Sequence, residues 1–418
     1  MPLGSLPSLL FLFLLMGCEH RETEGPRVEA RDSAGVTIVE NRGEVGSHGG
    51  GWKVSAEALL SIGTFQGDSL YQLYQVQGAR RLSGGGVAVA NAGSGEIRVY
   101  DQRGVFVRNL GRRGEGPGEF QRPALAGALR GDTLVVADMQ LRRLTLVHPE
   151  AGFVGSARVA EDVGGAVLPQ GILGDRTVVL GGGFYWSGST GETLAEGYTR
   201  RPTSYRSCSL EGDLVTDFGE FPGSEFNVQI RSVGGGMAMS ARLIPFGKYP
   251  MQAVSPAFLH VGSGESWEVR SYRPSGELAR IVRLDREPRP VRREDLDAYV
   301  REAVAEATDP SQAQEIRRGI QDLPTPDFMP AFASLHADGR GYLWVERYRA
   351  PGEEPAVHDI LDPEGRLVGW VSLPVGLQIL EIGPDYLLGL HRDDLEVEYV
   401  RVLALERPGG QRRDVASS

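Results

Sequence analysis

From Gly35 onward, short apolar runs are separated by glycine-rich turns almost to the end of the chain. Several runs alternate apolar and polar residues one by one, which is the pattern of a half-buried β-strand. One unit recurs as a strand, a tight turn with glycine and a second strand, with clear copies at 97–107, 269–278 and 358–368. Asp-Pro-Glu-Gly and its variants suit these turns, because Pro presets φ and Gly accepts a positive φ.

Two further units accompany the hairpins. A β-rich strand precedes them, as in 86–91, 132–138 and 341–346, and a strand that ends in glycine leads into a glycine-rich loop after them. Together they predict four strands in a fixed order for each repeat, which is one blade of a β-propeller. A pair of β-sandwiches is disfavoured by this four-strand period.

The hairpin turns indicate five blades, and their glycines are Gly104, Gly152, Gly212, Gly276 and Gly365. A sixth blade is predicted to be split between the two ends of the chain. Residues 386–390 and 397–403 supply two of its strands, 59–62 supplies the outer strand, and 35–40 is expected to add an edge strand there. Closing the ring in this way removes exposed sheet edges. The sequence therefore predicts an all-β fold, a six-bladed β-propeller over residues 35–407.

One segment breaks the β pattern. Between about 292 and 322 apolar residues recur at helical spacing, and Asp309-Pro310 begins a second helix, with Gln312 at the capping-box position. These residues predict a small helical insertion between blades 4 and 5. It is interpreted as a lid over the channel, a docking surface, or a packed insertion that covers a blade edge.

The N-terminus resembles a targeting signal. Residues 6–16 are apolar, too short a run to span a bilayer and typical of a signal peptide. Leu15-Met16-Gly17-Cys18 is similar to the lipobox of bacterial lipoproteins, although no Lys or Arg precedes Leu6. The resemblance implies a signal peptide at 1–17, lipid attachment at Cys18 and stable membrane anchoring. A plain secretory peptide and an incidental buried cysteine are the alternatives.

Polar residues after Cys18 predict a flexible tether over 18–34, and 408–418 is expected to be a disordered tail. If Cys18 is lipidated, Cys208 has no partner for an internal disulfide, and its alternating context indicates a packed strand residue. The formal net charge of −11 over 418 residues argues against nucleic-acid binding, which needs a basic face. A monomer is expected.

Candidate chemistry is sparse. Asn91, Asp138 and Glu346 each end the second strand of a blade, so they form a candidate ligand-binding set on one rim of the propeller; the alternative is turn chemistry. His336 lies on a predicted inner strand and either faces the channel or is a hydrogen-bonded structural histidine. No catalytic residue, metal site or cofactor is predicted, because the histidines form no H-x-x-x-H or H-E-x-x-H pair and no P-loop or nucleophile elbow occurs.

The segment 111–120, Gly-Arg-Arg-Gly-Glu-Gly-Pro-Gly-Glu-Phe, looks like NHL repeats. The body after about Gly35 resembles the bacterial six-bladed β-propeller lipoproteins, a family with no agreed reaction. The resemblance implies a lipoprotein anchored at the cell envelope, periplasmic or at the cell surface. We expect a scaffold that binds a protein, peptide or carbohydrate. The alternatives are a metal-dependent propeller enzyme, a gluconolactonase-like hydrolase or an NHL-type lyase, and a sensor partnered with a transporter.

Overall fold

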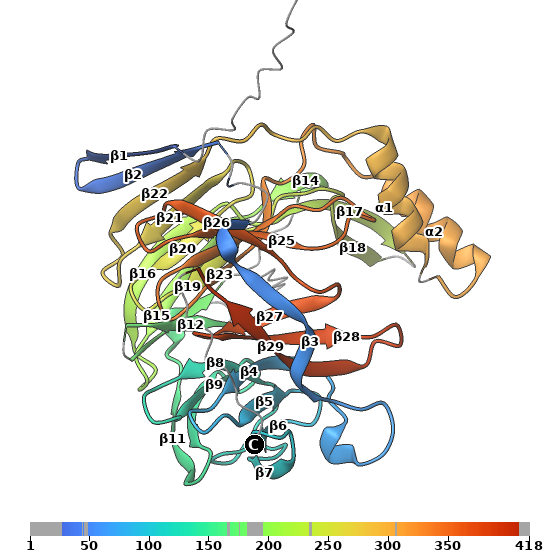
Figure 1. Cartoon of the computed structure of the whole chain (residues 1–418). Helices are drawn as coiled ribbons and strands as arrows, with labels where there is room; N and C mark the ends of the chain where they lie inside the picture. The colour runs from blue at the N-terminus through green and yellow to red at the C-terminus, as the bar shows by residue number, and fades with distance from the viewer. Residues whose placement is uncertain are drawn as a thin grey trace, which may run out of the picture.

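The computed structural model describes residues 27–43, 45, 49–164, 168–174, 176–181, 195–233, 236–305 and 307–408. Within these ranges the protein is nearly all β, and its strands form seven sheets (Figure 1). Six of them, which we number as sheets 1 to 6 in chain order, contain an antiparallel run of four strands. The seventh is a three-stranded side sheet.

The first three sheets follow one another along the chain. Sheet 1 consists of β4 (Val76–Arg81), β5 (Val87–Asn91), β6 (Glu96–Tyr100) and β7 (Phe106–Leu110). Sheet 2 consists of β8 (Pro123–Ala128), β9 (Leu134–Asp138), β10 (Arg143–His148) and β11 (Gly152–Arg158). Sheet 3 consists of β12 (Pro169–Leu173), β13 (Thr177–Gly181), β15 (Thr203–Cys208) and β16 (Leu214–Phe221).

Of the other three sheets, sheets 4 and 6 also include strands from the N-terminal part. Sheet 4 consists of β19 (Met251–Val254), β20 (Leu259–Gly262), β21 (Glu268–Tyr272) and β22 (Leu278–Leu284), extended by β2 (Val36–Arg42) and β1 (Arg27–Ser33). Sheet 5 consists of β23 (Phe332–Ala337), β24 (Leu343–Arg347), β25 (Val357–Leu361) and β26 (Leu367–Ser372). Sheet 6 consists of β27 (Leu377–Ile382), β28 (Tyr386–Arg392), β29 (Glu398–Glu406) and β3 (Lys53–Ile62).

The six sheets close into a ring. Their first strands contact one another in the order β4, β8, β12, β19, β23 and β27, and β27 returns to β4. One apolar cluster fills each of the six contacts between neighbouring sheets. The alternating strand residues predicted from the sequence point into these clusters, so burial of apolar area between sheets stabilises the ring. The architecture is therefore all-β and propeller-like.

Sheet 6 is built from both ends of the chain, as the sequence predicts. The outer strand β3 pairs antiparallel with β29, with Ile62 opposite Val400. The Glu398 carboxylate also accepts a hydrogen bond from the Val76 backbone amide of sheet 1 at 2.8 Å. Backbone pairing and this buried bond thus join the end of the ring to its beginning.

Two expectations for the N-terminal segment are wrong. The strand predicted at 35–40 is β2, and it pairs parallel with β22 in sheet 4, not in the split sheet. The second half of the predicted tether is β1, which pairs antiparallel with β2. All seven β1 residues are exposed, so backbone pairing with β2 holds this strand in place. Its sequence lacks the apolar alternation from which a strand is predicted. Residues 18–26 and 409–418 lie outside the described residues.

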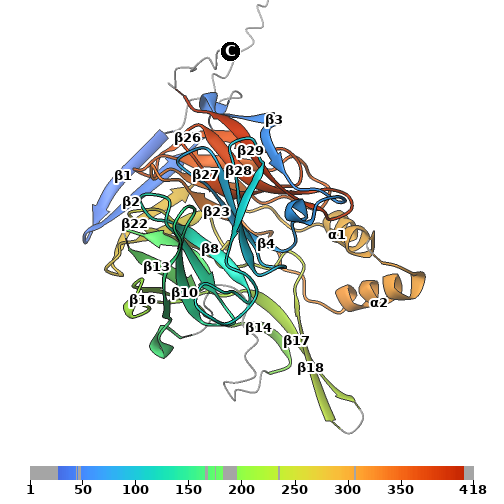
Figure 2. The same ribbon diagram turned by 90° about the horizontal axis from the view of Figure 1, so that it is seen from below.

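The side sheet also departs from the even strand period. It contains β14 (Gly197–Arg200), β17 (Glu225–Val233) and β18 (Gly236–Leu243), and the β17–β18 hairpin projects from the ring (Figure 2). The irregular glycine spacing near 181 and 234 falls around these strands. Three short 3₁₀ turns complete the described elements, at Gly49–Gly51, Ser69–Tyr71 and Glu161–Val163.

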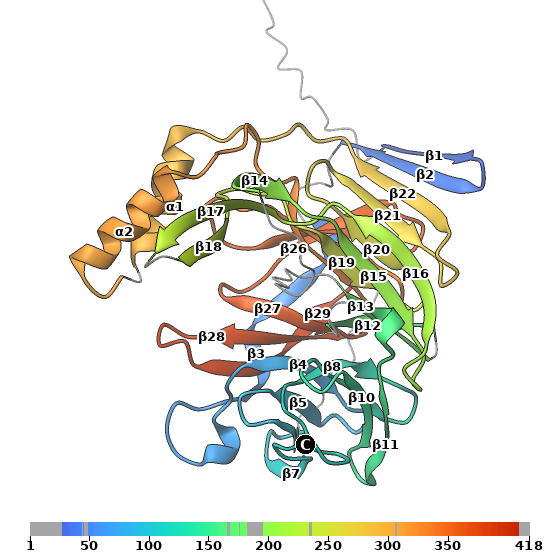
Figure 3. The same cartoon turned by 180° about the vertical axis from the view of Figure 1, so that it is seen from behind.

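The two helices predicted from apolar spacing are present as α1 (Arg293–Ala305) and α2 (Pro310–Gln321), between β22 and β23 in the chain. Asp309 caps α2 by accepting from the Ser311 and Gln312 amides, and the Gln312 side chain accepts from the Thr308 amide. The pair lies beside the β17–β18 hairpin (Figure 3). The Tyr299 ring of α1 packs 5.6 Å from the Phe246 ring, so α1 is anchored to the body by aromatic contact.

Candidate functional site

A central channel opens where the first strands of the sheets meet. Its cavity has a volume of about 890 Å³ and is lined from all six sheets. Every first strand contributes to the lining, for example with Arg80, Leu125, Gln170, Gln252, His336 and Gln378. A cavity with convergent polar groups is the usual place for a ligand.

The charged side chains on the channel wall are largely paired. Glu381 forms an ion pair with Arg80 at 3.1 Å and accepts from the Arg81 backbone amide at 2.8 Å. Asp338 forms an ion pair with Arg407 at 2.7 Å, and both side chains are buried. These pairs tie sheet 6 to sheet 1 and the last strand to sheet 5. The positive charges of the two arginines also compensate the negative charges of the two wall carboxylates.

Uncharged polar groups make up much of the remaining surface. The Gln252 side-chain amide donates to the Gln170 side-chain oxygen at 2.5 Å, and the Tyr205 hydroxyl donates to the Gln252 oxygen at 2.8 Å. Gln378 is exposed on the wall, and its side-chain amide has no hydrogen-bond partner among the described residues. The channel therefore offers amide donors and acceptors to a ligand.

A smaller pocket of about 350 Å³ branches from the channel and shares Ser334, His336 and Gln378 with it. The Ser334 hydroxyl donates to the Glu346 carboxylate at 2.7 Å, and His336 Nε2 lies 3.2 Å from the same hydroxyl oxygen. Because the serine proton is used on Glu346, the His336 Nε2–H donates to Ser334 and Nδ1 is left as an acceptor.

Burial keeps the histidines of this pocket neutral. Desolvation, and secondarily the nearby His358, lowers the pKa of His336 to about 3. Desolvation by burial also lowers the pKa of His358, to about 4. The two rings lie 6.0 Å apart between centroids. The Ser334 hydroxyl is thus held by a carboxylate, and the imidazole of His336 is uncharged.

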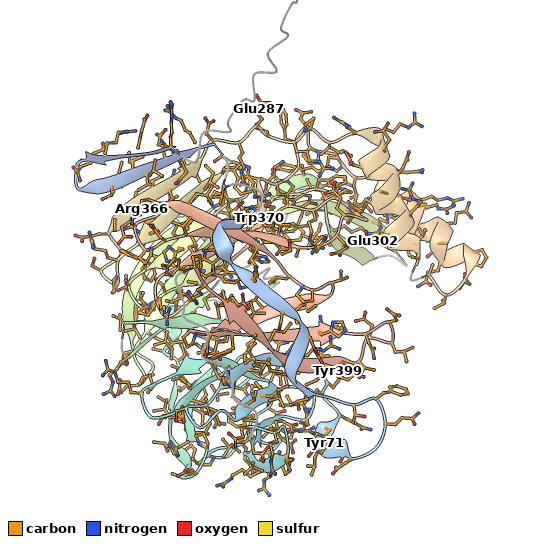
Figure 4. All side chains as sticks on the ribbon, in the orientation of Figure 1. Tyr71, Glu287, Glu302, Arg366, Trp370 and Tyr399 are labelled. Atoms are coloured by element: carbon orange, nitrogen blue, oxygen red, sulfur yellow. The ribbon has the colours of Figure 1, made fainter. Side chains whose placement is uncertain are left out.

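The structure thus brings two of the predicted site residues together. Glu346, on β24, and His336, on β23, line the same pocket. Glu346 also lines a third cavity, of about 450 Å³, whose opposite wall is α1 with Tyr299 and Glu302. Figure 4 marks Glu302 on the side of α1 that faces the sheets. The helical insertion therefore borders the third cavity, which shares Glu346 with the side pocket.

Asn91 and Asp138 are placed differently. Asp138 is fully buried, and its carboxylate accepts from four backbone amides, those of Gln121, Arg122, Gln140 and Leu141. Asn91 is also buried, and its side-chain oxygen accepts from the Tyr74 amide at 2.8 Å. Both side chains thus accept hydrogen bonds from backbone amides near their turns, which is the alternative to ligand binding given in the sequence analysis. Neither residue lines the channel.

The two cysteines differ in what can be described. Cys18, the predicted lipid-attachment residue, lies outside the described residues. Cys208 is fully buried on β15, and burial raises the pKa of its thiol to about 12. Cys208 is thus a packed strand residue, as predicted, and its thiol stays protonated at neutral pH.

Several channel residues escaped sequence reasoning. Gln252, Gln378 and Glu381 lie on the first strands of sheets 4 and 6, Arg340 lies in the β23–β24 turn, and none of them belongs to a motif. Alternation predicts that every second strand residue faces one side, but it does not identify the side that faces the channel. Among the described residues no group of three or more His, Cys, Asp and Glu side chains is placed to hold a metal ion. No described helix has the length and apolar character to cross a membrane.

No known protein-family model matches the chain, and no curated protein matches it in sequence. Three solved structures of similar fold are an exported-protein candidate from Bacteroides fragilis, a gluconolactonase from Xanthomonas campestris and virginiamycin B lyase from Staphylococcus aureus. Their identities to this chain are 12%, 11% and 10%, and their TM-scores are 0.47, 0.37 and 0.38. They cover 88%, 84% and 85% of this chain and 99%, 100% and 100% of their own.

Proposed function

We propose that this chain is an exported, lipid-anchored scaffold at a bacterial cell envelope that binds an uncharged polar ligand, a carbohydrate or a peptide segment, in its channel. In this proposal sheets 1 to 6 are the blades of one six-bladed propeller, and α1 and α2 are an insertion between blades 4 and 5. Support for the ring comes from the closed order of contacts among the first strands and the apolar cluster at each contact between sheets.

The observation that carries the proposal is the composition of the channel wall. Its carboxylates, Asp338 and Glu381, are each engaged by an arginine, whereas Gln378 and His336 present uncharged donors and acceptors. Arg340, at the edge of the wall, is the one charged side chain of the lining without an ion pair among the described residues. A ligand with hydroxyl or amide groups satisfies such a surface without a charge of its own. Six rigid strands also hold these groups in place, which reduces the ordering cost of binding.

The donor set fits a channel metal poorly. A divalent ion would need oxygen or imidazole ligands from several sheets, but both wall carboxylates of the described residues would first have to leave their guanidinium partners. The pairing of both carboxylates with arginines therefore favours ligand binding over the metal-dependent hydrolase or lyase. That enzyme stays the alternative, and the experiment below separates the two.

The test uses protein beginning at Gly25. We would measure its metal content and its melting temperature with and without chelator. We would then measure by calorimetry its binding to a panel of mono- and disaccharides and of dipeptides blocked at both termini, which carry no terminal charge. We expect at least one saccharide or dipeptide to bind, and Gln378→Ala to weaken binding by about tenfold through loss of one ligand hydrogen bond. Gln66→Ala, an exposed glutamine outside the channel, is the matched control.

Two results would count against the proposal. A stoichiometric metal ion whose removal lowers the melting temperature would favour the enzyme and justify a lactone and lyase screen. Binding that is unchanged in both Gln378→Ala and His336→Ala would place the ligand outside the channel.

A further inference from the structure

A further cavity, which adjoins the channel, lies between sheets 4 and 5. Its volume is about 220 Å³. Its apolar wall comes from both sheets and includes Phe258, Val282, Leu343 and Leu361. An engineered apolar cavity of about 150 Å³ is large enough to hold benzene, so this one has room for a ring with a small substituent.

Arg280 of β22 extends along this cavity without an acidic partner. One terminal nitrogen of its guanidinium donates to the Pro363 carbonyl, and the guanidinium carbon lies 5.6 Å from the centroid of the Phe258 ring. Its Nε is buried and has no hydrogen-bond partner. No carboxylate among the described residues forms an ion pair with Arg280, and burial lowers the pKa of its guanidinium. A half-buried cation with an unsatisfied donor is costly unless an anion compensates it.

The nearby carboxylates of Glu364 and Asp362 oppose the effect of burial on the pKa of Arg280 through space, but neither forms an ion pair with it among the described residues. Asp362 lines the cavity, but its carboxylate accepts from Arg366 Nε at 2.7 Å and from the backbone amides of Glu364 and Arg366. The other polar wall residue, His260, bonds through its two ring nitrogens to the Ser271 and Ser255 hydroxyls. Neither group leaves a free acceptor directed at Arg280.

A second arginine stands at the mouth of the same cavity. Arg340 lies in the turn between β23 and β24, is exposed, and lines both this cavity and the channel. In the described part of the chain its guanidinium has neither a salt-bridge nor a hydrogen-bond partner. Two guanidinium groups with spare donors therefore border one small, apolar cavity that opens on the channel.

We propose that the cavity between sheets 4 and 5 binds a small apolar carboxylate, such as an aryl or short alkyl acid. Its carboxylate lies between Arg280 and Arg340, and its apolar body packs on Phe258, Val282, Leu343 and Leu361. The guanidinium fork matches a carboxylate in geometry and charge, and burial of the apolar body adds to the affinity. The anion compensates two guanidinium charges that form no ion pair with a carboxylate of the described residues.

The test is calorimetric titration of the full-length protein with benzoate and with hexanoate, and with benzamide as a neutral molecule of similar shape. We expect at least one of the two acids to bind at a single site, and benzamide to bind about tenfold more weakly than benzoate or not at all. Arg340→Gln should weaken binding of the acid by about tenfold, since Arg340 is exposed and its loss leaves the core intact.

Arg130→Gln is the matched control, because Arg130 is an exposed arginine in the corresponding turn of sheet 2 and should leave the affinity unchanged. Arg280→Met is a second variant that keeps the side-chain length and should also lose the acid. The proposal is overturned if neither acid binds at about 10 mM, if benzamide binds as tightly as benzoate, or if Arg340→Gln binds the acid normally.

Discussion

Buried polar side chains in this protein mostly serve the backbone. The Asp138 carboxylate receives four amide hydrogens at the end of β9, two from the chain before the sheet and two from the turn after the strand. Asn91 holds the corresponding corner of sheet 1 through the Tyr74 amide and through Ser94. The same position in two neighbouring sheets thus fixes how each first strand enters its sheet.

We expect Asp138→Ala to lower the free energy of unfolding by about 3 kcal/mol, because four buried or half-buried amides lose a charged acceptor. Asn91→Ala should cost less, since one amide loses its acceptor. Urea unfolding of both variants beside Asp213→Ala, an exposed aspartate in another turn, measures the difference. Equal stability of the Asp138 and Asp213 variants would contradict this assignment.

His260 makes stability depend on pH. Burial, with the Arg280 charge, lowers its pKa in the folded protein to about 3, whereas an unfolded histidine titrates near 6.5. Below pH 6.5 the unfolded chain therefore binds a proton that the folded chain does not, and stability falls as the pH falls toward 3. This linkage removes about 2 kcal/mol between pH 7 and pH 5.

The measurement is urea unfolding of the wild type and His260→Gln at both pH values. The variant is expected to be less stable at pH 7, because the Ser255 and Ser271 contacts change, but to lose about 2 kcal/mol less than the wild type on acidification. An unchanged pH dependence would show that His260 is protonated in the folded protein.

At the scale of elements, the β1–β2 hairpin links two sheets. Asn41 on β2 is buried, and its side-chain amide donates to the carbonyls of Arg283 in sheet 4 and Gly365 in the β25–β26 turn of sheet 5. Its oxygen accepts from the Leu367 amide at 2.8 Å. The added strand therefore fastens sheet 4 to sheet 5 beside the small cavity that contains Arg280.

Asn41→Ala should lower the free energy of unfolding by about 2 kcal/mol, because backbone groups of both sheets lose their partner in a buried setting. Asn41→Asp should cost more, since a carboxylate oxygen would then face two carbonyls. Thr37→Ala, at an exposed position of the same strand, is the control and should be nearly neutral. Differential scanning calorimetry would contradict the prediction if all three variants melted together.

At the scale of the whole molecule, closure of the ring creates the channel, and the predicted lipid anchor would place it at a membrane. If Cys18 is lipidated, Cys18→Ser should abolish incorporation of labelled palmitate and move the protein from the membrane to the soluble exported fraction, because the acyl chains supply the anchoring energy. Cys208→Ser is the control, since Cys208 is buried in sheet 3. Palmitate labelling that persists in Cys18→Ser would contradict the lipoprotein assignment.

Local patterns were enough to predict much of the architecture. Alternation and glycine turns located the four-strand repeats and the split sheet that joins 59–62 to the C-terminal strands. Apolar spacing and an Asp-Pro start located α1 and α2. These features follow from the chain alone, because strand alternation, positive φ at glycine and helix capping are set by neighbouring residues.

The site depended on tertiary structure. The sequence placed His336 on an inner strand, but only the folded ring shows that Ser334, His336 and Glu346 share a pocket and that Glu381 meets Arg80 across two sheets. Likewise β1 has no apolar signal, and β2 joins sheet 4 through contacts about 240 residues away in the chain. The sequence by itself determined the repeats, the helices and the predicted export signal. Tertiary structure decided which residues line the channel, which arginines pair with its carboxylates, and which arginines between sheets 4 and 5 form no ion pair among the described residues. The reason is that pairing and burial of side chains depend on partners that no local pattern specifies.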